Sequence, residues 1–488
     1  MYDFPMLLRF RCKNFRSIRE EQELSLVAIN TRSDERNDSL LETPVKGLKA
    51  LRSAALYGAN ASGKSNLLSA MHVFSRMVSA SQRRWNPTGA IPTWDPFALD
   101  ESSATEESEF QIDFVIEQKV YNYGFRFNRT IFIEEWLKDI TRREKQIFRR
   151  STSPKTIPGN FEQEMGRLAT LQSAQVSAEE SEVSVKYPGR NLGDTAKSSK
   201  HLAAIKLQTR SNSLFLSAAA QNNHEFLAGV FRWIVQRFSE LSTDAPRTLR
   251  FYTAEYCSEP ARKEKVKELL RFADIGIADV EVAEEEEPEQ AKQFHAAFVR
   301  ALKEVDPETA SNLSEAPSFS RHNIKMVHSV AAGKSYPLNF EQESAGTQSY
   351  FSMLGPLLDV LRDGTLVLID ELEASLHPLL ARHIVRIFND PKLNPNGAQL
   401  IFATHDINLL DLDLMRRDQI WFTEKNDSGA TILVPLSEFK VRTDQNIASA
   451  YMHGRFGGIP FLDERWLRAA LEAPKDKPCE PISDGQAR

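Results

Sequence analysis

The sequence predicts an α/β fold, and three observations predict it. A short apolar run, Ala54–Tyr57, is followed by the glycine-containing loop Gly58–Ser65 and then by good helix formers. Two continuous apolar runs, Thr365–Asp370 and Leu400–Thr404, are typical of parallel strands buried on both faces. Three runs of strand character between Phe110 and Ile140, with turns near Gln118 and Asn128, indicate an antiparallel meander.

Composition sets broad limits on the class of protein. A chain of 488 residues suggests two to four folding units, and 41% apolar with 26% charged residues is typical of a globular protein. A net charge of −6 gives no bulk attraction to nucleic acid, which lowers the odds of DNA binding without excluding it. Cys12, Cys257 and Cys479 lie far apart and suggest free thiols. Without an apolar run of roughly 20 residues or a signal peptide, we expect no membrane contact and a cytoplasmic protein.

The loop Gly58–Ser65 fits G-x-x-x-x-G-K-[ST], a phosphate-binding pattern. Its glycines let successive backbone N–H groups point inward as an anion nest, and the following helix aims its positive end at the same place. Lys64 can reach the β- and γ-phosphates, while the Ser65 hydroxyl can bind Mg²⁺. The sequence therefore predicts ATP and Mg²⁺ as cofactors, with the nucleotide held by Asn60, Ala61, Ser62, Gly63, Lys64, Ser65 and Asn66.

The N-terminal region contains further strands. Met6–Phe15 alternates apolar and basic residues, and Leu24–Ile29 is a second strand candidate. Asn30–Asn37 is a predicted loop, and Leu48–Tyr57 leads into the phosphate loop. A proline-punctuated connection, Trp85–Phe97, follows the loop's helix.

The middle of the chain changes character twice. Ser151–Lys200 is poor in large apolar residues, so we expect irregular structure. From His201 to Asp306 the apolar spacing is helical, with one stripe ending at Phe238 and another helix ending near Gly276. Ala291–Val305 is a third predicted helix, and the acidic run Glu284–Glu287 before it is expected to be a solvated link. Strand character returns at Ile324–Ser329 and Tyr336–Phe340.

Acids and a histidine follow the two buried strands. Asp370 and Glu371 end the run that starts at Thr365, and ligands bind at this edge of α/β sheets. We expect Asp370 to hold Mg²⁺ and Glu371 to polarise the attacking water. His405 follows Leu400–Thr404 directly and is predicted to sense the γ-phosphate or position water. Asp411-Leu412-Asp413 is a lone D-x-D, best explained as a capping loop.

A second anion site is predicted at Glu343–Gln348, which opens an apolar helix that ends at Asp363-Gly364. Exposed N–H groups, two hydroxyls and the helix dipole would favour a phosphate there. We expect Pro356 to kink this helix. Two such cradles for one triphosphate are hard to arrange within one subunit, which favours a homodimer or higher homo-oligomer in which Ser344–Gln348 serves the partner's nucleotide.

Four motifs in one order carry a resemblance: G-A-N-A-S-G-K-S-N-L, E-S-A-G-T-Q, L-V-L-I-D-E-L-E-A-S-L-H-P and F-A-T-H-D. The chain resembles the ABC-type ATPase head of SMC, Rad50 and RecF proteins. It is closer to the overcoming-lysogenization-defect (OLD) group of anti-phage ATPases. Two further segments also resemble that group: K-N-F-R-S-I (Lys13–Ile18) and Y-M-H-G-R-F-G-G-I-P-F (Tyr451–Phe461). The nearest named case is the ATPase subunit of the PARIS system, with Septu-type ATPases as the close alternative.

The resemblance implies roles for residues. Glu371 would be the catalytic base, His405 the switch histidine and Ser375–Pro378 a dimer-contact loop. The signature acting in trans would be Ser344, Ala345, Gly346, Thr347 and Gln348, which reads S-A-G-T-Q here rather than L-S-G-G-Q. Gln82 and Gln111 are weak candidates for the Q-loop glutamine. OLD nucleases continue into a Toprim domain, whereas only about 25 residues follow Phe461 here, too few for a domain.

We therefore expect an ABC-type P-loop ATPase head with a large, mainly helical insertion. Residues 1–140 would form the N-terminal lobe with the meander, 141–323 an irregular and then helical lid or partner domain, 324–463 the C-terminal lobe, and 464–488 a polar tail. Slow, regulatory hydrolysis would control a separate effector from the same operon, a Toprim or HNH nuclease, in anti-phage defence with a phage protein as trigger. The alternatives are a RecF/SMC-like DNA-repair clamp and, less favoured because of the long insertion, a transporter's nucleotide-binding subunit. The neighbouring gene would separate the three.

Overall fold

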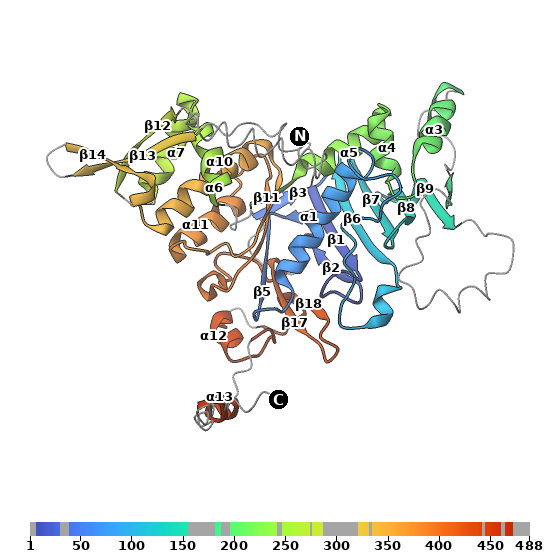
Figure 1. Ribbon diagram of the computed structural model, residues 1–488. Helices are drawn as coiled ribbons and strands as arrows, with labels where there is room; N and C mark the ends of the chain where they lie inside the picture. Colours follow the sequence, from blue (N-terminus) through green and yellow to red (C-terminus); the bar gives the residue numbers. More distant parts are fainter. Residues whose placement is uncertain are drawn as a thin grey trace, which may run out of the picture.

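The structure, a computed structural model, describes residues 6–29, 39–154, 181–186, 196–241, 246–273, 276–285, 321–330, 334–441, 445–459 and 464–471. These residues form a mixed α/β fold, as predicted, with a six-stranded and a seven-stranded sheet and two smaller sheets (Figure 1). Among the described helices, none is long and apolar enough to cross a membrane.

The six-stranded sheet carries the phosphate loop. Its order is β11-β15-β16-β5-β17-β18, and every neighbouring pair is parallel except β17 with β18. All residues of β15, β16 and β5 are buried, which confirms the prediction from their apolar runs. The bounds are β5 Ser53–Gly58, β11 Phe238–Leu241, β15 Leu366–Ile369, β16 Gln399–Ala403, β17 Ile420–Lys425 and β18 Thr431–Pro435.

The seven-stranded sheet is antiparallel, in the order β10-β9-β8-β7-β6-β1-β2. Its strands β6, β7 and β8 are the predicted meander. The prediction of irregular structure after Ser151 is wrong in part, because β9 continues to Pro154 and the described residues of that segment also form β10 and the start of α3. The bounds are β1 Met6–Lys13, β2 Gln22–Ser25, β6 Ser108–Ile116, β7 Lys119–Phe127, β8 Phe132–Asp139, β9 Lys145–Pro154 and β10 Ser181–Lys186.

The first helix, α1 (Lys64–Ala80), packs between the two large sheets. Phe74 of α1 stacks on Phe125 of the meander with ring centroids 5.4 Å apart and meets Phe10 of β1 edge-on at 6.2 Å. On the same helix, Leu67 and Met71 are buried in the same core cluster as Leu56 of β5. Because α1 begins at the phosphate loop, this packing fixes the loop against both sheets.

A buried ion pair joins the meander to the helical region. Glu135 on β8 and Arg150 on β9 are fully buried and lie 3.4 Å apart. The Glu135 carboxylate accepts the N–H groups of Phe215 (2.6 Å) and Leu216 (2.9 Å) at the start of α4, and Arg150 donates to the carbonyl of Arg210 (2.8 Å). These contacts explain why the chain stays paired beyond Lys145, where the sequence shows no apolar run.

The helical region contains α3 to α7, as its periodicity predicts, but also strands. Phe238 continues the apolar stripe of α5 in sequence, yet it starts β11, because pairing with β15 extends the central sheet there. Residues 277–285 form β12 instead of helix or link, so Glu284 and Glu285 end a strand. The predicted loop 30–37 and the predicted helix 291–305 lie outside the described residues. The bounds are α3 Ala196–Gln208, α4 Phe215–Gln221, α5 Glu225–Arg237, α6 Pro246–Tyr256, α7 Pro260–Phe272 and β12 Ile277–Glu285.

A three-stranded antiparallel sheet, β12-β13-β14, lies beside α6 and α7 (Figure 1). The expected boundary between residues 323 and 324 falls inside β13, so this sheet joins the two predicted units. A small pair, β3 with β4, and two C-terminal helices, α12 and α13, are further elements, and α13 lies in the segment expected to be a polar tail. The bounds are β3 Leu40–Glu42, β4 Lys49–Leu51, β13 Arg321–Val330, β14 Lys334–Asn339, α10 Ala345–Asp363, α11 Pro378–Asn389, α12 Ile447–Met452 and α13 Glu464–Leu471.

The helix α10 continues through Pro356, where the sequence predicts a kink. Proline has no N–H, so the carbonyl of Ser352 one turn earlier loses its usual donor. The hydroxyl of Thr253 on α6 donates to that carbonyl (2.8 Å) and accepts the N–H of Gly355 (3.1 Å). The predicted C-cap is confirmed, since Gly364 ends α10 in the left-handed region with φ 64°.

Candidate active site

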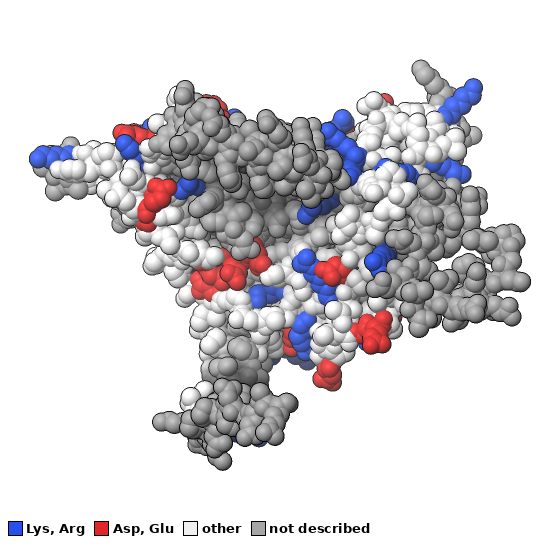
Figure 2. All heavy atoms as spheres, in the orientation of Figure 1, with Lys and Arg blue, Asp and Glu red and all other residues white. Residues whose placement is uncertain are grey.

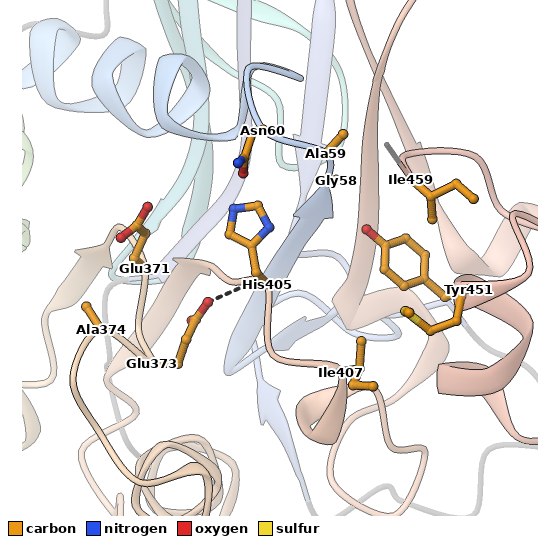
Figure 3. Close-up of a pocket in the computed structure, with 11 residues that line it drawn as sticks. Gly58, Ala59, Asn60, Glu371, Glu373, Ala374, His405, Ile407, Tyr451 and Ile459 are labelled. Carbon is orange, nitrogen blue, oxygen red and sulfur yellow. Dashed lines mark hydrogen bonds between the residues drawn. The ribbon is translucent and has the colours of Figure 1, made fainter. Parts of the chain in front are cut away.

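A cleft of about 870 Å³ opens at the carboxyl edge of the central sheet (Figure 3). Predicted site residues from three distant segments meet in it: Asn60 after β5, Glu371 after β15 and His405 after β16. Parallel strands end at one edge of a sheet, so the strand order β15-β16-β5 brings these segments together. The lining residues are Gly58, Ala59, Asn60, Glu371, Glu373, Ala374, His405, Ile407, Tyr451, Met452 and Ile459.

Residues of β17 and β18 contact the phosphate loop closely. Gly63 has φ 115°, and a Cβ there would overlap the hydroxyl of Thr431 on β18. That hydroxyl donates to the Ser62 carbonyl (2.8 Å), while the Ser62 hydroxyl lies 2.5 Å from that of Thr423 on β17. Only glycine fits at position 63 without strain, which agrees with the requirement of the motif.

Lys64 lies over its own loop. Its Nζ donates to the carbonyls of Gly58 (2.8 Å) and Ala59 (3.1 Å). Burial lowers the pKa of Lys64, and the carboxylates of Asp370, Glu373 and Glu371 oppose that shift. An anion bound in the loop would offer this cation a stronger partner than two carbonyls.

The other predicted loop residues begin α1 or flank it. Ser65 is exposed at the first turn of the helix, where its hydroxyl is accessible, and Ala61 is also exposed. Asn66 donates to the hydroxyl of Ser17 (2.7 Å), which ties α1 to the loop after β1.

The loop after β15 has an unusual backbone. Glu371 is exposed and has φ 52°, a left-handed conformation that costs a non-glycine residue on the order of 1–3 kcal/mol. The N–H of Ala374 donates to the Glu371 carbonyl (2.8 Å) and closes a turn, and Ser375 has φ 61°. Asp370 is half-buried directly after the strand. Backbone strain of this kind clusters at functional sites, which makes this loop a candidate part of the site.

His405 faces the phosphate loop. Figure 3 shows its imidazole pointing toward Asn60, with Glu371 and Glu373 on the neighbouring loop. Burial and then the charge of Lys64 lower the pKa of His405, while Glu373, Glu371 and Asp370 act to raise it. The net shift is downward, which favours the neutral imidazole, the form that can both donate and accept a hydrogen bond.

The predicted signature does not line this cleft. Ser344 caps α10, with its hydroxyl accepting the N–H of Thr347 (3.1 Å), and Gln348 donates to the carbonyl of Glu343 (2.9 Å). A Cβ on Gly346 would lie 2.7 Å from the carbonyl of Ser375. The signature therefore rests against the loop that carries Glu371, and Ser344 and Ala345 are exposed beside it.

Two parts of the site were not identified as such from the sequence. Tyr451, Met452 and Ile459 form an apolar wall of the cleft, although their segment was noted only for its resemblance to a family. A Cβ on Gly458 would lie 3.3 Å from Cα of Gly58, and the Tyr451 hydroxyl donates to the Gly458 carbonyl (3.0 Å). The second is Glu373, whose only signal is its position two residues after Glu371.

The weak Q-loop candidates are not part of the cleft. Gln82 follows the far end of α1, on the order of 25 Å from Lys64 at 1.5 Å per residue, so that assignment is wrong. Gln111 on β6 bonds to Glu21 (3.2 Å) and Glu109 (3.1 Å) instead. Asp411 accepts the N–H of Asp413 (2.6 Å), which is the expected capping turn.

A search of curated proteins found no match. Among solved structures, the chain is similar to an SMC head bound to the C-winged helix domain of ScpA, with 14% identity, coverage of 88% of this chain and 97% of that chain, and a TM-score of 0.34. It is also similar to the SMC head domain from Thermotoga maritima, with 10% identity, coverage of 89% and 99%, and a TM-score of 0.35.

A family model matches residues 53–182 and 232–411, more than half of the chain. The matched residues include the phosphate loop, the signature, Asp370, Glu371 and His405. The prediction of an ATP-binding ATPase is confirmed at the level of this family: the chain belongs to the family described as "AAA domain, putative AbiEii toxin, Type IV TA system".

Proposed function

We propose that this chain is an ABC-type ATPase that binds Mg-ATP in the cleft and closes with a second copy around the nucleotide. One observation carries the proposal. The cleft gathers Asn60, Glu371 and His405, whereas the predicted signature does not line it and instead lies against the Glu371 loop, with Ser344 and Ala345 exposed. A signature that does not line the cleft of its own subunit would be available to the phosphate loop of a partner.

The residues present fit a nucleoside triphosphate with Mg²⁺. The loop has two glycine positions with no space for a Cβ, Gly58 and Gly63, and an exposed hydroxyl at Ser65. Ser65 and Asp370 would hold Mg²⁺, which would neutralise charge on the β- and γ-phosphates. Lys64 would exchange its two carbonyls for phosphate oxygens.

Two residues would act on the γ-phosphate and on the water that attacks it. Glu371, exposed at the cleft, would orient the water and accept its proton, because a positioned carboxylate can do both. His405 would form a hydrogen bond with the γ-phosphate from the neighbouring loop.

The trans arrangement is tested by mixing two inactive variants. Ser344→Arg places bulk and charge at the start of α10 and should abolish hydrolysis while ATP binding at Lys64 persists. Lys64→Ala removes a charge that neutralises the phosphates and should lose tight binding. A mixed dimer contains one intact loop facing one intact signature, so we expect recovery of up to half of the wild-type rate per dimer. If activity does not recover at any mixing ratio, with subunit exchange verified, the signature does not act on the nucleotide of the partner subunit.

We further propose that the ATPase controls a separate effector in anti-phage defence, as its resemblance to OLD-like and PARIS ATPases suggests. In this proposal, residues 1–140 and 324–463 form the two lobes, and 141–323 dock the effector, a Toprim or HNH nuclease from the same operon. Hydrolysis would be slow and regulatory, with a phage protein as trigger.

Charge supports a protein as the ligand in preference to duplex DNA. The net charge is −6, and DNA affinity depends on clustered Lys and Arg that release counterions. On the face shown in Figure 2, the described Lys and Arg side chains are interspersed with Asp and Glu. Purification from the native operon tests this: an ATP-sensitive complex with a neighbouring gene product supports effector control. A protein that elutes alone and binds DNA with a steep salt dependence supports the DNA-clamp alternative.

A further inference from the structure

Glu373 lines the cleft, and none of the roles above uses it. Its carboxylate crosses from the loop after β15 to the loop after β16, where Oε1 accepts the backbone N–H of His405 at 2.5 Å (Figure 3). The Leu372 N–H beside it donates to the Ala403 carbonyl (3.1 Å), so a backbone bond and a side-chain bond join the same two loops.

Among the described residues, this bond is the side chain's single hydrogen bond, and Glu373 forms no ion pair there. The second oxygen, Oε2, is buried and has no hydrogen-bond partner among them. A buried carboxylate oxygen without a partner costs stability. A residue kept only for folding would be expected to satisfy both oxygens, so the arrangement indicates a role in the cleft.

The position of Glu373 suggests what that role is. Glu371, two residues earlier, is the proposed water-orienting carboxylate, and Ser375, two residues later, contacts Gly346 of the signature. The His405 side chain is exposed, so packing around the imidazole does not fix its position. Among the groups that face the imidazole, Lys64 lowers its pKa and Glu373, Glu371 and Asp370 raise it, with Glu373 the strongest of the three acids.

We propose that Glu373 is a positioning residue for His405: its carboxylate holds the His405 backbone, so that the imidazole stays over the γ-phosphate end of the phosphate loop. It would act through His405 and not on the nucleotide itself. The kinetic part of this proposal rests on the proposed ATPase mechanism, whereas its structural part does not.

Hydrogen exchange tests the structural part without any turnover. In Glu373→Ala, the peptide spanning residues 403–408 should exchange faster than in wild type, because the His405 N–H loses its acceptor. Glu373→Gln retains an acceptor oxygen and should keep most of the protection. A matched control is Asp390→Ala, which removes a carboxylate that accepts a backbone N–H, from Lys392 (2.8 Å), on a loop that does not line the cleft. Unchanged exchange at 403–408 in Glu373→Ala would overturn the proposal, whether or not the protein hydrolyses ATP.

A double-mutant cycle tests the kinetic part. We expect Glu373→Ala to lower kcat about 10- to 100-fold with little change in KM, since misplacing a catalytic group by about 1 Å can cost that much. Glu373→Gln should restore most of the rate. In a His405→Ala background, Glu373→Ala should have no further effect, because the group it positions is absent. Effects that multiply would show that Glu373 acts independently of His405 and would overturn the proposal. A wild-type protein without ATPase activity would instead refute the proposed function and leave the exchange result to decide.

Discussion

Replacing Gly63 by alanine should disable the phosphate loop, and the structure gives the size of the effect. At φ 115° an alanine is strained by on the order of 1–3 kcal/mol. Its Cβ would also overlap the Thr431 hydroxyl and lie 2.7 Å from Cγ2 of the same residue, and overpacking of this kind costs about 1–3 kcal/mol more. The sum is roughly 2–6 kcal/mol, a large fraction of the stability of a typical domain.

Urea unfolding and binding of a fluorescent ATP analogue measure this cost. Gly229→Ala is the matched control, because Gly229 lies in α5 with nothing within 4 Å of its Cβ position, and alanine should stabilise that helix by about 0.5–1 kcal/mol. Adding Thr431→Ala to Gly63→Ala removes two of the overlapping atoms but not the backbone strain, so we expect partial recovery only. The reasoning is refuted if Gly63→Ala unfolds at the same urea concentration as wild type and binds the analogue equally well.

The remaining predictions concern catalysis and stability. Glu371→Gln should keep ATP affinity and lower turnover by about 10²- to 10⁴-fold, the usual contribution of a general base, in a coupled ATPase assay; turnover at the wild-type rate would remove Glu371 from that role. Glu135→Ala leaves Arg150 buried without its carboxylate and should cost about 3–5 kcal/mol in urea unfolding, whereas a loss below about 1 kcal/mol would mean that the pair does not join the sheet to α4. Thr253→Val should destabilise α10 by about 1–3 kcal/mol, because the Ser352 carbonyl loses its donor, while Thr253→Ser should be mild. Burial acts to raise the pKa of Glu134, but Arg126 and Arg149 outweigh it and lower that pKa in the folded state. The stabilisation from Glu134 is therefore present above its unfolded pKa of about 4.3 and is lost as the pH falls through the pKa of the folded state. The free energy of unfolding of Glu134→Gln should therefore decrease less steeply than that of wild type as the pH is lowered through this range.

Much of the central sheet could be predicted because its signals are local. Continuous apolar runs mark β5, β15 and β16, and a residue that lines the cleft follows each strand within two positions. The order of strands then places those residues together without further information. The bounds of α10 could also be predicted, since Ser344 and Gly364 are the cap residues that the start and end of this helix require.

The strands that were missed depend on partners distant in sequence. Nothing in Phe238–Leu241 distinguishes it from the end of the preceding helix, and pairing with Leu366–Ile369 decides its conformation. The stretch after Lys145 is held by Arg150, a residue type that is rarely buried, through contacts with Glu135 and the carbonyl of Arg210. Local propensity is a weak guide where tertiary contacts supply the hydrogen bonds.

The apolar wall of the cleft depends on a contact between residues that are distant in the sequence, so it could not be predicted from local patterns. Gly458 is about 400 residues from Gly58, yet it fits against Gly58 because neither residue has a side chain. Read alone, Gly457-Gly458 signals only a turn, and both residues do have left-handed φ values of 69° and 67°. Their second property, close approach to the phosphate loop, exists only because β17 pairs with β5 and brings Thr423 opposite Gly58. The Gly58 carbonyl accepts a hydrogen bond from Lys64. A movement of the Gly58 peptide would therefore directly displace the segment that carries Tyr451 and Met452.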